Sequence, residues 1–179
     1  MPTKNNQIQT DSNKNNELEP CYGCGAQVQK SDGSTHGYIG ASPGCWAVFG
    51  EVLAKEYEEF NYPPVHRLTV DAYAAQHPGK PSRQTIQSVA VHLIGLHLML
   101  DLIHDADWTT KTISKVVQNS QDFHWLEPPS SLGGMTILDV YGTENLKDHT
   151  DHVYNWVHAV WHAWQPHHAQ IHAWANWDQ

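Results

Sequence analysis

The cysteines are the residues of this chain whose type and spacing point most directly to chemistry. Cys21 and Cys24 lie in the motif Cys-Tyr-Gly-Cys-Gly, and Cys45 is the third and last cysteine. Two thiols separated by two residues can fold back on one cation, because the glycines permit the tight turn that this requires. The pair therefore predicts a zinc knuckle. A thioredoxin-like redox pair is one alternative, although no βαβ pattern surrounds the motif, and unligated reduced thiols are the other.

A tetrahedral zinc site needs a fourth ligand once the three thiols are used. His36 lies between Cys24 and Cys45, and His77 lies just before Pro78, where a predicted helix ends. Spacing alone does not choose between the two histidines, and water or another group is a third option. A helix end fixed by proline favours His77 because it gives an ordered imidazole. The Gly-Ser-Thr-His-Gly context of His36 would have to be immobilised by the metal itself.

The histidine and tryptophan content is a second indication of chemistry. Fourteen histidines and eight tryptophans are far above ordinary usage, and both concentrate in the C-terminal third. An aromatic core with histidines at its margin is one explanation, and a metal or proton-transfer site is the other. His97, Asp101 and His104 fall at i, i+4 and i+7 on one flank of a predicted helix, so the carboxylate could orient an imidazole or join it at a metal. The same two explanations apply to His92, His167 and His168.

The charge balance and the lack of targeting signals exclude several function classes. Ten Lys plus Arg against nineteen Asp plus Glu give a formal net charge of −9, whereas nucleic-acid binding depends on clustered cations. The chain contains neither an apolar run of about 18 residues nor the apolar segment of a signal peptide. We therefore expect a cytoplasmic protein with no nucleic-acid and no membrane partner. Its partner would be a protein or a small molecule, and a homodimer is one option.

Helices are the elements that must position these side chains. Apolar residues at helical spacing predict helices over 45–60, from 63 to about 76, over 83–103, from Thr109 or Thr110 to 117, and over 146–177. Pro166 implies either two helices that meet there or a single kinked one. Segments 21–44 and 118–140 carry turn residues and read as irregular. The third helix should be the buried centre, through the stripe Ile86, Val89, Leu93, Leu96, Leu100 and Ile103.

The predicted fold is therefore all-α. It is a helical bundle with an N-terminal looped Cys-x-x-Cys zinc knuckle packed on it. Residues 1–19 are polar and asparagine-rich, and they should form a disordered tail. Residues 20–179 should form a single domain.

A set of motifs resembles a bacterial family of small helical proteins that is catalogued as a domain of unknown function. These motifs are Cys-x-x-Cys-Gly, Asp32-Gly-Ser-Thr-His36-Gly-Tyr38, Ser42-Pro-Gly-Cys45-Trp46, Tyr73-Ala-Ala-Gln76-His77-Pro78 and Ser88-Val-Ala-Val-His92-Leu. The resemblance runs from Cys21 to the C-terminus. It implies Zn²⁺ binding by Cys21, Cys24, Cys45 and His77, and it carries no assigned activity.

Two functions remain open at the level of sequence. The first is a non-catalytic binding or scaffolding module with a structural Cys3His zinc site. The second is a metal-dependent enzyme, a hydrolase or thiol transferase, with a histidine-lined pocket between the central and last helices. The text His-His-x-Gln-Ile from His167 to Ile171 is similar to the last helix of DinB-like metal-binding bundles, which implies a metal site there. One tight zinc would favour the module, and a second exchangeable metal would favour the enzyme.

Overall fold

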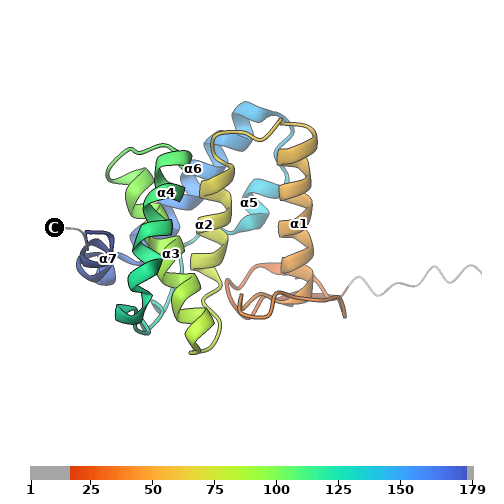
Figure 1. Ribbon diagram of the computed structural model, residues 1–179. Helices are drawn as coiled ribbons and strands as arrows, with labels where there is room; N and C mark the ends of the chain where they lie inside the picture. Colours follow the sequence, from red (N-terminus) through yellow and green to blue (C-terminus); the bar gives the residue numbers. More distant parts are fainter. Residues whose placement is uncertain (1–16, 177–179) are drawn as a thin grey trace, which may run out of the picture.

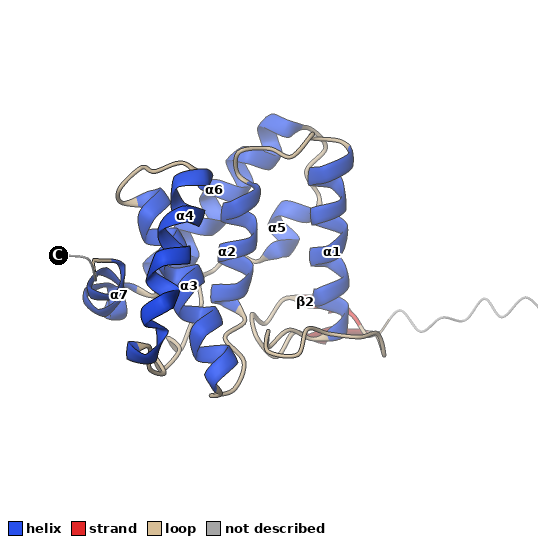
Figure 2. Ribbon diagram, in the orientation of Figure 1, coloured by secondary structure: helices blue, strands red, loops and turns tan. Residues whose placement is uncertain are grey.

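The structure is a computed structural model that describes residues 17–176, apart from the side chains of residues 119–121. Seven α-helices and one two-stranded sheet make up this part of the chain, so the predicted all-α class is confirmed. Figure 1 shows the helices packed side by side, with the N-terminal loops gathered at one end of α1. Figure 2 shows how little strand structure accompanies them. Within the described residues, no helix combines the length and apolar character that a bilayer span needs.

The N-terminal segment contains a short antiparallel hairpin. Strand β1 (Leu18–Pro20) pairs with β2 (Gln27–Gln29), with Leu18 opposite Gln29. The prediction of a disordered tail through residue 19 is therefore wrong for residues 18 and 19. The Cys-x-x-Cys turn brings the chain back beside them, and backbone pairing needs few apolar side chains. Residues 1–16 of that predicted tail lie outside the described residues, as do residues 177–179 of the predicted domain.

Helices α1 and α2 follow the hairpin and carry two of the predicted ligands. Helix α1 (Pro43–Glu58) begins two residues earlier than predicted, because Ser42 caps it and Pro43 suits the first helical position. The predicted position of Cys45 in the first turn is confirmed. Helix α2 (His66–Gln76) begins three residues later than its Pro63 signal and ends at His77, which is the C-cap.

Helix α3 (Arg83–Leu100) begins at the predicted residue, where Ser82 caps it, but it ends three residues early. Its stripe is buried at Val89, Leu93 and Leu96, where at most 4 % of each side chain is exposed. Ile103, the last member of the predicted stripe, is 79 % exposed, so its predicted burial is wrong. The chain leaves the helix after Leu100, and Ile103 adopts a left-handed conformation with φ of 58°.

The C-terminal half differs from the prediction in helix ends. Helix α4 (Ala106–Val116) is capped by Asp105, so the expected start at Thr109 or Thr110 is wrong, and a 3-10 turn (Val117–Asp122) follows it. Helix α5 (Ile137–Tyr141) lies in a segment predicted to be irregular and is started by a capping box at Thr136. Pro166 separates α6 (Leu146–Ala163) from α7 (His168–Ala175) through a 3-10 turn (Gln165–His167), which is the first of the two predicted options.

Helices α2 and α3 form the centre of the bundle. Helix α3 packs against α2, α4, α6 and α7, as predicted for the central helix, while α1 packs mainly on α5. In Figure 1, α1 and α7 lie at opposite edges of the molecule. The largest side chains that are fully buried are Trp156, Trp164 and Tyr73. The tryptophan excess therefore reflects the core, as the first of the two explanations proposed.

Histidine–carboxylate pairs tie the helices together inside this core. Glu56 of α1 is fully buried. Its carboxylate accepts hydrogen bonds from His66 Nδ1 at 2.6 Å and His149 Nε2 at 2.7 Å, which come from α2 and α6. The buried Asp71 of α2 likewise accepts one from His92 Nδ1 of α3 at 2.7 Å. Burial of a charge requires such partners, and this explains part of the histidine excess.

Candidate metal centre

Three separate elements bring the four predicted ligands together. Cys21 and Cys24 come from the turn after β1, Cys45 from the first turn of α1, and His77 from the C-cap of α2. One ligand atom from each residue lies within 4.8 Å of all the others, and these side chains are close enough to bind a metal ion. Cys21, Cys45 and His77 are buried, and Cys24 is half-buried.

The distances between donor atoms fit a tetrahedral ion. Cys24 Sγ lies 3.8 Å from Cys45 Sγ, and Cys45 Sγ lies 3.4 Å from His77 Nε2. Zinc bonds to sulfur at about 2.3 Å and to nitrogen at about 2.0–2.1 Å, so the edges of a tetrahedral site are about 3.8 Å for S···S and about 3.5 Å for S···N. These two distances therefore match the edges of a tetrahedral Cys3His site, and the remaining pairs of donor atoms lie within 4.8 Å of one another.

Backbone hydrogen bonds close the cysteine turn, and a glycine lets it lie close to the end of α2. The amide of Cys21 donates to Ala26 O at 2.8 Å, and the amide of Gly25 donates to Cys21 O at 2.8 Å. A side chain at Gly23 would collide with Gly40 O and the His77 ring, so only glycine lets the turn approach His77. The glycines of the motif therefore allow both the tight turn and its close approach to His77.

Neighbouring groups orient the imidazole and support negative charge on sulfur. His77 Nδ1 donates to Tyr73 O at 2.7 Å, which directs Nε2 toward the thiols. The hydroxyl of Tyr73 donates to Cys45 Sγ at 3.6 Å, and the Ser42 amide donates to Cys21 Sγ at 3.4 Å. The N-terminus of α1 adds its positive dipole end beside Cys45. This surrounding shell is the kind that holds thiolate and imidazole ligands in place.

The proton affinities of the cluster are strongly perturbed. A hydrogen bond from Cys24, followed by one from Cys45, holds the pKa of Cys21 far below its ordinary value. The same contact with Cys21 raises the pKa of Cys45. Burial acts to lower the pKa of His77, but hydrogen bonds to Cys21 and Cys24 outweigh it and raise that pKa to about 9. A metal ion would displace the protons that these groups share, which couples metal binding to proton release.

His36, the other predicted fourth ligand, lies outside this cluster. Its ring packs edge-on against Tyr38, with 4.3 Å between ring centroids, and lies 5.4 Å from the ring of Trp46. His36 and Thr35 line an open groove of about 1260 Å³ beside the cysteines.

Gln76 connects the helix end that carries His77 to residues 128–133, which also line the groove. Its side-chain amide nitrogen donates to Leu132 O at 2.9 Å and to Met135 O at 2.7 Å, and its oxygen accepts from Trp156 Nε1 at 3.1 Å. Residues 128–133 line the same groove as the knuckle, so Gln76 ties this loop to the helix end beside His77. In the sequence Gln-His-Pro, the first residue anchors this loop, the second joins the thiols, and Pro78 lines the groove.

Of the other candidate histidines, the structure places only His97 in a ligand-type cluster. His97 and Asp101 are together, with 2.9 Å between His97 Nδ1 and Asp101 Oδ2, but the third member is His172 of α7 and not His104. His104 stacks on Trp108, 3.5 Å between centroids. The His167 and His168 rings donate to backbone oxygens of Glu127 and Trp161, at 2.8 and 3.0 Å, and belong to neither of the two ligand clusters found among the described residues.

Sequence reasoning missed His172, as well as His66 and His149 of the buried Glu56 network. No local signal could have identified His172, because its partners lie on another helix far along the chain. Burial lowers the pKa of His97. Burial acts to raise the pKa of Asp101, but hydrogen bonds from His97 and Trp161 outweigh it and lower that pKa. A neutral imidazole therefore faces an ionised carboxylate.

Comparison with known proteins gives one match. Neither the curated proteins nor the solved structures provide a similar chain. A family described as a family of unknown function (DUF5946) matches residues 19–165, which include the whole knuckle, Cys45, the Gln-His-Pro element and most of the bundle. The motifs that suggested a bacterial family of unknown function agree with this result, and the chain belongs to the DUF5946 family.

Proposed function

We propose that this chain is a zinc-binding helical module, in which a structural Cys3His zinc fastens the knuckle to the bundle. The convergence of Cys21, Cys24, Cys45 and His77 in one largely buried cluster is the observation that carries the proposal. Zinc is the metal we assign because three thiolates and one imidazole are its usual structural donor set. Four protein ligands complete a tetrahedral shell, so the ion has no open position for water or substrate.

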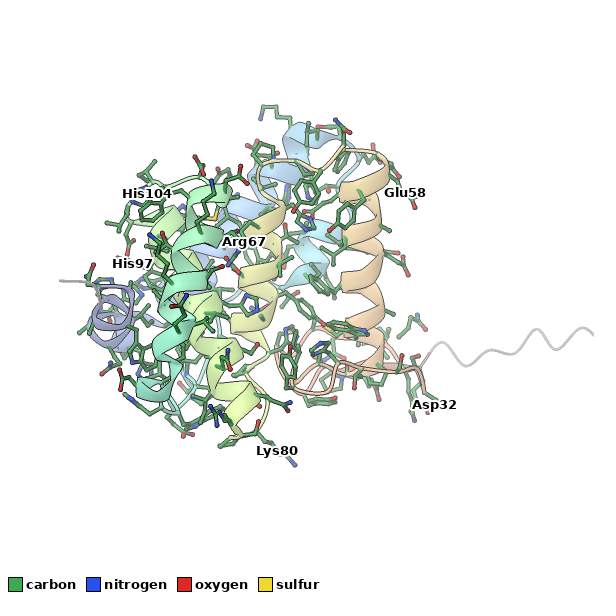
Figure 3. The ribbon with its side chains drawn as sticks, in the orientation of Figure 1. Asp32, Glu58, Arg67, Lys80, His97 and His104 are labelled. Carbon is green, nitrogen blue, oxygen red and sulfur yellow. The ribbon has the colours of Figure 1, made fainter. Side chains whose placement is uncertain are left out.

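The module would act by binding a partner in the groove beside the zinc. The knuckle forms one wall of this groove, and residues 78–82 and 128–133 form the others. Lys80 is exposed where the loop before α3 reaches the groove, and Figure 3 shows it at the same end of the molecule as Asp32 of the loop between β2 and α1. The zinc would thus hold a binding surface in shape rather than perform chemistry itself. The groove's mixed polar and apolar lining suits a protein segment or a small molecule that carries both kinds of group.

Metal analysis of cysteine variants tests the zinc assignment. In Cys21→Ser and Cys24→Ser, bound zinc should fall well below one per chain and the melting temperature should fall with it, because coordination supplies folding free energy. His36→Ala is the matched control, since it changes a nearby side chain outside the cluster and should keep one zinc. Full zinc occupancy in both serine variants would contradict the proposal.

Hydrogen exchange separates a structural zinc from a catalytic one. The amides of Cys21 and Gly40 donate to Ala26 O and His77 O, and these bonds join the knuckle to itself and to α2. Removing zinc with a chelator should abolish protection of these amides while the amides of α6 remain protected. If the knuckle amides stay protected without metal, the zinc does not hold this segment and the structural role is refuted.

A further inference from the structure

A second group of ligand-type side chains lies where the end of α3 meets α7. His97 is in the last turn of α3, Asp101 is its C-cap, and His172 belongs to α7. One nitrogen of each ring and one carboxylate oxygen lie within 4.8 Å of one another. Figure 3 places His97 on the side of the bundle next to α7, away from Asp32 in the loop between β2 and α1. The cluster is therefore separate from the cysteine site.

Both imidazoles face the same carboxylate oxygen. His97 Nδ1 lies 2.9 Å and His172 Nε2 lies 3.5 Å from Asp101 Oδ2, and the two rings stack with 4.0 Å between centroids. His172 Nε2 is shielded from solvent, yet it has no hydrogen-bond partner among the described residues. A buried ring nitrogen without a partner is unfavourable, and a cation between it and the carboxylate would satisfy it.

An outer layer of contacts fixes the carboxylate. Asp101 Oδ1 accepts a hydrogen bond from Trp161 Nε1 at 3.1 Å, which leaves Oδ2 directed at the two imidazoles. The Trp161 ring in turn stacks on His168, with 3.8 Å between centroids. Metal-binding carboxylates are commonly held in this way by a donor on their second oxygen. The Asp101 carboxylate is therefore already oriented in the absence of a metal ion.

The buried network around Glu56 shows what a purely structural histidine–carboxylate link looks like in this protein. There the Glu56 and His149 side chains are at most 1 % exposed, and hydrogen bonds join the carboxylate to both imidazoles. In the second cluster, by contrast, the Asp101 and His172 side chains are 36 % and 41 % exposed, and one imidazole nitrogen is left unpaired. Solvent access and an unpaired donor atom together distinguish a ligand site from a structural cross-link.

We propose that His97, Asp101 and His172 form a second metal site, which binds a divalent first-row transition ion through two imidazoles and one carboxylate. This donor set suits zinc, iron(II), nickel or copper better than magnesium or calcium. Three protein ligands leave further positions for water or a small ligand. The ion at this site is therefore exchangeable and open to chemistry, unlike the ion enclosed by the cysteines.

Cobalt(II) titration of the full-length, zinc-loaded protein tests this site directly. Dialysis followed by elemental analysis should show one cobalt bound in addition to one zinc, with ligand-field absorption but no thiolate-to-cobalt band. Asp101→Asn and His172→Ala should each weaken the cobalt affinity by about 10-fold or more, because each removes a ligand. His158→Ala removes an exposed histidine of α6 and should leave the affinity unchanged. The zinc content of every variant should remain one per chain, which reports that the bundle is intact.

Three outcomes would overturn the proposal. They are the absence of a second metal in the wild-type chain, undiminished cobalt binding in both Asp101→Asn and His172→Ala, and a thiolate band showing that the added cobalt lies at the cysteines. His172 is partly exposed, so its replacement tests the site even if Asp101→Asn disturbs the end of α3. The serine variants of the knuckle lose zinc without affecting this result, so the two metal sites are tested independently.

Discussion

Replacing Glu56 with glutamine tests whether the buried histidine–carboxylate links hold the bundle together. The Glu56 carboxylate accepts hydrogen bonds from His66 at 2.6 Å, His149 at 2.7 Å and Thr69 Oγ1 at 2.7 Å. These donors come from α2 and α6, so one side chain of α1 joins three helices. Glutamine has the same shape but no charge, and it offers one acceptor oxygen where glutamate offers two.

The expected loss of stability follows from these contacts. At least one hydrogen bond is lost, because the amide NH2 then faces a donor, and the bonds that remain become neutral ones. Hydrogen bonds to charged groups contribute about 1.5–3 kcal/mol each, and neutral ones contribute about 1 kcal/mol. We therefore expect Glu56→Gln to lower the free energy of unfolding by about 3 kcal/mol, the lower end of the range for breaking a buried ionic contact.

The effect should depend on pH in a defined direction. Burial acts to raise the pKa of Glu56, but hydrogen bonds from His149, His66 and Thr69 outweigh it and lower that pKa. A carboxyl group whose pKa is lower in the folded state contributes stability above its unfolded-state pKa of about 4.3. This contribution is lost as the pH falls through the folded-state pKa. The difference in stability between the wild type and Glu56→Gln should therefore shrink in acid.

Urea denaturation at pH 7 measures the change in the free energy of unfolding. Saturating zinc is present, so that metal binding contributes equally to the stability of every variant. Glu58→Gln is the matched control, because Glu58 is exposed at the end of the same helix, as labelled in Figure 3. It should change the unfolding free energy by less than about 0.5 kcal/mol. Equal stability of the two glutamine variants would show that the Glu56 network contributes nothing, and the reasoning would be refuted.

Two further predictions concern the metal ligand and the packing of α3. His77→Ala should weaken zinc retention against a chelator by about 10-fold or more, while His36→Ala should leave it nearly unchanged, and the reverse order in a competition assay would reassign the ligand. Gly95→Ala should destabilise the chain despite the higher helix propensity of alanine, because its Cβ would collide with a buried carboxylate of α2. Gly50→Ala, whose Cβ meets open space in α1, should be neutral or stabilising in thermal unfolding, and similar melting temperatures for both variants would contradict this packing.

Local patterns in the sequence determined much of the fold. The Cys-x-x-Cys-Gly turn, the cap at Ser82, the helix end at His77 and the break at Pro166 all depend on residues within a few positions of one another. Backbone geometry and capping act over this range, so they can be predicted without knowing the packing. The helical class followed from the same short-range periodicity.

The strand pairing and the end of α3 were harder to predict from the sequence. The hairpin of Leu18–Pro20 with Gln27–Gln29 depends on a return of the chain that composition does not show. Helix α3 ends where Asp101 engages His97 and Trp161, the second of which lies 60 residues away along the chain. A polar tail and a continued apolar stripe were reasonable predictions, but tertiary contacts overrode both.

By itself, the sequence determined the three thiols, their turn and the helix ends that offer Cys45 and His77 to a metal. Only the tertiary structure decided that His77 and not His36 lies with them, since Cys45 and His77 are 32 residues apart. It also decided that Glu56 is buried between His66 and His149 and that Asp101 meets His172. The physical reason is the same in each case. Spacing fixes which residues share a turn or a helix face, whereas contacts between distant helices depend on how all of them pack.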